Sequence, residues 1–103
     1  MKKRYLQNID RQELARYVGH MDQVAGIKLF EGGDGVERGA RVLQVWTGTG
    51  LTFNVLGDRA MDISTCQYKG MSLTWKSPVG DAHPAYYDGA GAAWLRTFQG
   101  GML

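Results

Sequence analysis

Two stretches of the 103-residue sequence carry side chains that could act on a small molecule. In the first, Gly57-Asp-Arg-Ala-Met-Asp62, Arg59 stands between Asp58 and Asp62. A carboxylate on each side could hold the guanidinium rigidly while its spare N–H donors face a ligand. The alternative is a structural ion-pair cluster at a turn. Arg59 is therefore a candidate substrate-binding residue.

The second stretch places Arg96 between Trp94 and Phe98. At the spacing of a strand these three side chains share one face, because alternate residues point the same way. Aromatic rings stack on the C–H faces of a pyranose and planar donors bind its hydroxyls, so this composition is typical of a sugar site. The alternative is an arginine whose apolar stem covers the edge of a core. We take Trp94 and Arg96 as further candidate substrate-binding residues.

The loop before this stretch adds a candidate for proton transfer. Residues 77–91 contain prolines and glycines that oppose regular structure, and they also contain His83, Tyr86 and Tyr87. A loop of that length is usually functional or disordered, and its aromatic residues argue against disorder. Imidazole titrates near neutrality, so His83 is the candidate catalytic residue. The alternative is an ordinary surface histidine.

Other catalytic chemistries have little support in the sequence. His20, His83 and Cys66 lack the short spacings of a structural zinc site, so we expect no metal and no other cofactor. Cys66 lies in a predicted strand, where a buried and inert thiol is the ordinary interpretation. Gly48-Thr-Gly50 precedes a strand, whereas a phosphate-binding loop needs glycines that open a helix.

Composition restricts the class of protein and its partners. The chain has the length of one domain, and 44% hydrophobic with 21% charged residues exclude intrinsic disorder. Three of the 12 basic residues lie at positions 2–4, so the rest is nearly neutral and nucleic acid is not an expected partner. No apolar run is long enough to span a membrane. The single cysteine and the absence of a secretory signal fit a cytoplasmic protein.

Glycine usage predicts the fold class. The sequence has 15 glycines and two prolines, and the glycines separate short apolar runs, which indicates an all-β protein with many turns. One short helix is expected near residues 11–18, capped by Asp10. Residues 1–22 then form a helical lead-in and residues 23–103 a β segment. The predicted strands are 24–30, 40–46, 51–55, 61–68 and 71–76, with Lys69-Gly70 as a two-residue turn.

Three sequence blocks resemble a known family. They are Asp34-Gly-Val-Glu-Arg-Gly-Ala-Arg-Val-Leu43, Leu51-Thr-Phe-Asn-Val-Leu-Gly-Asp-Arg-Ala-Met-Asp-Ile63 and Trp94-Leu-Arg-Thr-Phe-Gln-Gly-Gly-Met-Leu103. Over about residues 20–103 the chain resembles an uncharacterised aldose 1-epimerase-like family of the galactose mutarotase-like superfamily, whose members are large antiparallel β-sandwiches. Ala60 stands where the Asp-Arg-Gly block of that family has glycine.

The resemblance implies a function and a boundary. Family members are several times longer, so the chain is expected to be the N-terminal part of a sandwich, truncated at its C-terminus. The implied activity is sugar binding for anomeric or epimeric interconversion, with Arg96 as the sugar-holding arginine and His83 as a lesser contact. The acid and base of such enzymes usually lie later in the chain, so this segment alone is expected to be inactive. The alternative is a noncatalytic carbohydrate-binding or assembly module, and exposed sheet edges would favour self-association.

Overall fold

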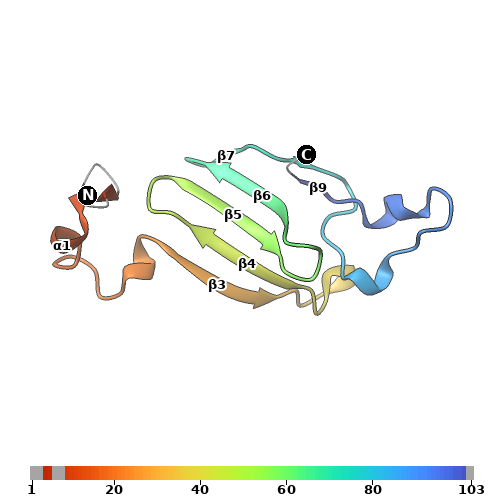
Figure 1. Ribbon diagram of the computed structural model, residues 1–103, viewed down its shortest axis with the longest axis horizontal. Coiled ribbons are helices and arrows are strands. Elements are labelled where there is room, and N and C mark those ends of the chain that lie inside the picture. The colour runs from red at the N-terminus through yellow and green to blue at the C-terminus, as the bar shows by residue number, and fades with distance from the viewer. Residues whose placement is uncertain (1–3, 6–8, 102–103) are drawn as a thin grey trace.

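The computed structural model describes residues 4–5 and 9–101. Strands β1 (Arg4–Tyr5) and β2 (Ile9–Asp10) pair and lead into helix α1 (Arg11–Leu14). The carboxylate of Asp10 accepts a hydrogen bond of 2.9 Å from the backbone N–H of Glu13, which confirms the predicted cap. This segment lies at one end of the long axis of the molecule, away from the main sheet (Figure 1).

Helix α1 is shorter than predicted. It ends at Leu14 and continues as a turn, whereas the apolar stripe formed by Leu14, Tyr17 and Val18 predicted a helix to residue 18. Leu14 is buried, but Tyr17 of the same stripe is 76% exposed. An isolated short helix is unstable without a packed apolar face, so the unburied second half of the stripe does not sustain it.

The main sheet is an antiparallel meander of five strands in the order β3-β4-β5-β6-β7 (Figure 1). This confirms the all-β prediction and most of the predicted strands. Lys69 and Gly70 both have positive φ, as a two-residue hairpin turn of type I′ requires. The five strands are β3 (Gly26–Glu31), β4 (Arg41–Trp46), β5 (Leu51–Leu56), β6 (Asp62–Tyr68) and β7 (Met71–Ser72).

The predicted strand over residues 71–76 is divided in two. After β7 the hydroxyl of Ser72 donates to the carbonyl of Thr74, and this local hydrogen bond turns the backbone out of the ladder. The chain then forms β8 (Trp75–Lys76), which pairs with β9 (Gly100–Gly101) near the end of the sequence.

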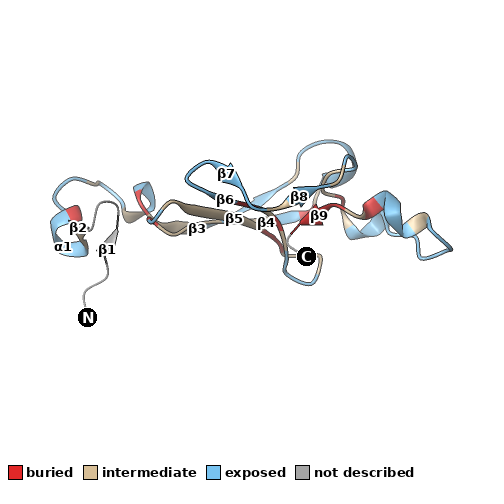
Figure 2. Ribbon diagram, turned by 90° about the horizontal axis from the view of Figure 1, so that it is seen from above, coloured by how far each residue is buried: buried red, intermediate tan, exposed pale blue. Residues whose placement is uncertain are grey.

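The strand register gives the main sheet one apolar and one polar face. On the apolar face Ile27, Val45, Phe53 and Cys66 lie opposite one another across four strands. Seen from above, the main sheet is a single layer, coloured mostly as intermediate or exposed (Figure 2). The radius of gyration of the chain is 16.7 Å, against about 13 Å for a compact domain of this length. The described residues therefore leave much of the apolar face uncovered.

The segment from residue 77 to 99 runs at the opposite end from α1 (Figure 1). It holds the short 3₁₀ turn η3 (Pro84–Tyr86) and the 3₁₀ helix η4 (Ala93–Thr97). The largely irregular loop predicted for 77–91 is confirmed, with η3 as its 3₁₀ element and a hydrogen-bonded turn from Ser77 to Gly80. The strand spacing assumed for Trp94 to Phe98 is wrong, because η4 has about three residues per turn.

Two further 3₁₀ turns flank β3. The first, η1 (Met21–Gln23), is capped by His20, and the second, η2 (Gly35–Glu37), is capped by Asp34. The indole N–H of Trp46 donates to the carbonyl of Asp22 at 2.6 Å, which anchors η1 to the end of the main sheet.

Candidate functional site

Arg59 and His83 line the same cavity, which has a volume of about 250 Å³. Arg59 comes from the turn between β5 and β6, and His83 comes from the loop that precedes η3. The sequence singled out both residues as site candidates, and the fold brings them together. The remaining wall is formed by Ala82, Pro84, Tyr87 and Thr97.

The Arg59 guanidinium is held on two sides. Its Nη1 donates a hydrogen bond to the backbone carbonyl of Thr97, and its Nε lies 3.5 Å from a carboxylate oxygen of Asp62. Asp58, predicted to be the second carboxylate of this clamp, is bound to Arg41 instead. Arg59 is thus fixed by one carboxylate and one carbonyl, and it retains N–H donors beyond these two contacts.

His83 is oriented by its own turn. Its Nδ1 accepts a hydrogen bond of 3.0 Å from the backbone N–H of Ala85, and its backbone N–H donates to the carbonyl of Val36 at 2.7 Å. Because Nδ1 is an acceptor, we assign the proton of the neutral ring to Nε2. The Nε2–H has no partner among the described residues, so it can serve a bound ligand.

Trp94 and Arg96 lie outside this cavity. The Trp94 ring packs edge-on against Phe98, with ring centroids 5.5 Å apart. Arg96 is exposed and forms no hydrogen bond or ion pair within the part of the chain that the structure describes. The structure therefore unites two of the four predicted site residues and leaves the other two on the surface of η4.

Comparison with known proteins identifies the family. Residues 37–103 match the family model described as a domain of unknown function, DUF4432. The chain belongs to the DUF4432 family. No curated protein matches the chain, and no solved structure matches it.

The whole Arg59–His83 cavity lies within the matched DUF4432 region. That region also includes Gly100 and Gly101, where a Cβ would collide with the backbone of β8 and of β6. Ala60, in the same region, has a φ of +51°, a left-handed conformation that favours glycine. Packing therefore explains the glycines at positions 100 and 101, and backbone conformation explains a preference for glycine at position 60, whether or not these positions contact a ligand.

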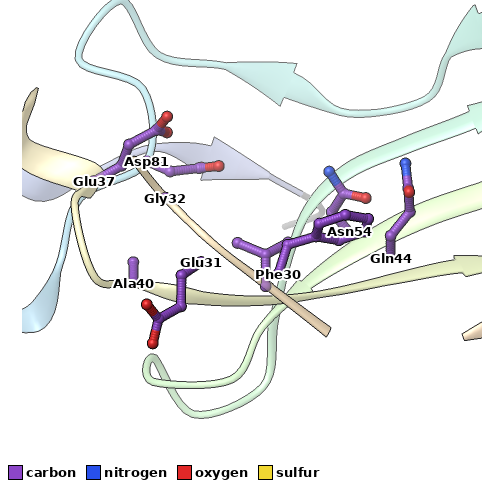
Figure 3. Close-up of a pocket in the computed structure, with 9 residues that line it drawn as sticks. Phe30, Glu31, Gly32, Glu37, Ala40, Gln44, Asn54 and Asp81 are labelled. Atoms are coloured by element: carbon purple, nitrogen blue, oxygen red, sulfur yellow. The ribbon is translucent and has the colours of Figure 1, made fainter. Parts of the chain in front are cut away.

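A larger cavity of the DUF4432 chain, of about 360 Å³, lies over the polar face of the main sheet (Figure 3). Sequence reasoning missed it because neutral side chains in a strand carry no motif. One usable signal was the alternation of Thr52 and Asn54 with apolar residues in β5. The cavity is lined by Phe30, Glu31, Gly32, Glu37, Ala40, Val42, Gln44, Asn54 and Asp81.

A polar cluster around the buried Ser64 supports one side of this larger cavity. Ser64 is fully buried in β6, and its hydroxyl donates to the carboxylate of Asp81. The Lys76 ammonium lies 2.8 Å from the Ser64 hydroxyl and 3.2 Å from the same carboxylate. The cluster ties the 77–99 segment to the main sheet and neutralises the charge of Asp81.

Two other kinds of feature are absent from the described residues. They contain no group of three or more His, Cys, Asp or Glu side chains placed to hold a metal ion. In the same residues no helix is long and apolar enough to cross a membrane.

Proposed function

We propose that this chain is the sugar-binding part of an aldose 1-epimerase-like protein of the galactose mutarotase-like superfamily. The observation that supports this proposal is the shared cavity of Arg59 and His83. It combines a fixed guanidinium, an imidazole with a free N–H and the aromatic ring of Tyr87. These are the groups that a pyranose requires, since it presents both hydroxyls and apolar C–H faces.

The proposed reaction is interconversion at the anomeric carbon. A base removes the proton of O1 while an acid protonates the ring oxygen, and the bond between C1 and the ring oxygen breaks. Reclosure on the other face of the carbonyl gives the other anomer. His83 is the proposed acid in its doubly protonated form, which gives its Nε2 proton to the ring oxygen and keeps the second proton on Nδ1. Arg59 holds ring hydroxyls.

A noncatalytic carbohydrate-binding module is the second candidate. It is favoured by one observation: no carboxylate lines the described part of the Arg59–His83 cavity, so the base is missing there. Binding and catalysis therefore need separate measurements.

The test is a set of NMR titrations with D-galactose, D-glucose and L-arabinose. We expect Arg59→Ala to weaken binding by about 1.5–3 kcal/mol, the range for a hydrogen bond to a charged group. The matched control is Arg16→Ala, since Arg16 is an exposed arginine in the N-terminal segment. Unchanged affinity in a folded Arg59→Ala protein would refute the proposed cavity.

Exchange spectroscopy of the bound anomers separates the two candidates. Faster exchange with the wild-type chain, lost in His83→Ala, indicates an enzyme. Binding without faster exchange indicates a module. His20→Ala is the control, because the Nδ1 of His20 also caps a 3₁₀ turn, by accepting from the N–H of Asp22, yet lies outside the cavity.

A further inference from the structure

The polar face of the main sheet carries two adjoining cavities. The first is the 360 Å³ cavity described above, and the second has a volume of about 270 Å³. Gln44 and Asn54 line both, so the two form one continuous depression across β4, β5 and β6. We call this depression the polar trough. Its second half is completed by Thr52, Thr65 and Gln67, and it is also lined by Phe53, which belongs to the apolar row of β5.

The strand register sets the polar side chains of the trough in rows. Gln44, Asn54 and Thr65 lie directly opposite one another on three neighbouring strands, and Thr52 pairs with Gln67. Strands are about 4.8 Å apart, so hydrogen-bonding groups recur at that interval along a line perpendicular to the strands. Such a row suits an extended ligand with regularly repeating polar groups.

The hydrogen-bonding capacity of these rows is unused within the described chain. The side chains of Gln44, Thr52, Asn54, Thr65 and Gln67 make no hydrogen bond to any described residue. Each amide offers two N–H donors and a carbonyl acceptor, and each hydroxyl can donate and accept. All five are uncharged, so the trough offers many neutral donors and acceptors that do not contribute to holding the sheet.

An aromatic ring closes one end of the trough. Figure 3 shows Phe30 beside Asn54, with Gln44 next to it on the same side of the main sheet. The Lys28 ammonium lies 5.3 Å from the centroid of the Phe30 ring, a cation–π contact beside a ring residue that is 44% exposed. Asp81 lies at this end too, with its charge balanced by Lys76.

We propose that the polar trough binds an extended neutral oligosaccharide. A sugar chain needs many uncharged donors and acceptors along its length and an apolar platform for one ring, and the trough supplies both. A nucleic acid would need a row of cations, whereas the trough has carboxylates at its end. This site is separate from the Arg59–His83 cavity and does not depend on that cavity binding a monosaccharide.

The test uses the ¹⁵N-labelled full chain with maltotriose and cellotriose as probes. Single variants Gln44→Ala and Asn54→Ala assign the two side-chain amide signals. We expect at least one trisaccharide to shift both signals. In the double variant Gln44→Ala with Asn54→Ala, the Kd for that trisaccharide should rise about tenfold. The control Gln12→Ala removes an exposed amide from α1 and should leave the Kd unchanged. Thermal unfolding of each variant checks that the fold is intact.

The outcomes distinguish this site from the cavity. Binding that is lost in the double variant but kept in Arg59→Ala supports the trough. Binding that is lost in Arg59→Ala but kept in the double variant overturns the trough and leaves the proposed function standing. Amide signals that do not move with either trisaccharide at about 10 mM also overturn the trough.

Discussion

Arg41 donates three hydrogen bonds to the carboxylate of Asp58, and these bonds link the start of β4 to the turn between β5 and β6. The backbone N–H and Nε of Arg41 each donate at 2.9 Å, and Nη2 donates at 2.6 Å. Asp58 immediately precedes Arg59, so this contact fixes the turn that carries Arg59 into the cavity. The hydrogen bonds from the Arg41 side chain are the main cause that lowers the pKa of Asp58 below its usual value.

The lowered pKa of Asp58 predicts a loss of stability in acid. A carboxyl whose pKa is lower in the folded state stabilises that state at pH values above its unfolded pKa of about 3.9. This contribution is lost as the pH falls through the lower folded pKa. We expect the melting temperature of Asp58→Asn to lie beneath that of the wild type at pH 7 and to approach it as the pH falls through the lowered pKa of Asp58. Glu37→Gln, which alters an exposed carboxylate, is the control, and equal gaps at both pH values would contradict the prediction.

Ala60→Gly should stabilise the turn that carries Arg59. Ala60 has a φ of +51°, where a Cβ is strained and glycine is not. Part of the gain is cancelled because glycine adds freedom to the unfolded chain. We expect a rise of about 0.5–1 kcal/mol in the free energy of unfolding, measured with urea. Ala92→Gly is the matched control. Ala92 has a φ of −91°, where alanine is not strained, so this variant should have a lower free energy of unfolding than the wild type.

Gly100→Ala should disrupt the pairing of β8 with β9. A Cβ at this position would press on the carbonyl oxygen of Trp75 and lie 2.6 Å from its ring carbon Cε3, and the φ is +89°. We expect a loss of about 2–4 kcal/mol in the free energy of unfolding. Gly33→Ala should be nearly neutral, because a Cβ at Gly33 would meet no atom within 4 Å and the φ there is not positive. Equal unfolding free energies for the two variants would refute the steric argument.

The apolar face of the main sheet predicts self-association. Ile27 is 70% and Leu29 58% exposed, both on the outer strand β3, whose free edge can also pair with another strand. We expect sedimentation velocity to show association that increases with protein concentration. The double variant Ile27→Lys with Leu29→Lys should reduce it, while Lys28→Ala on the polar face should not. A wild-type chain that remains monomeric at every concentration would contradict this prediction.

The strands and hairpin turns were predictable because their causes are local. Alternating apolar and polar residues favour a half-buried strand wherever they occur, and Lys69-Gly70 favours a tight turn through the backbone freedom of glycine alone. Residue type also sufficed to select Arg59 and His83 as candidates, since guanidinium and imidazole have distinctive chemistry.

Only the tertiary structure decided which candidates share a site. Trp94 to Phe98 could form a strand or a 3₁₀ helix on local preference, and packing of Trp94 on Phe98 accompanies the helix. Asp58 was as plausible a partner for Arg59 as Asp62 is, until the register of β4 and β5 placed Arg41 beside it. Contacts between residues far apart in sequence depend on how whole strands and loops come together, and no short segment carries that information.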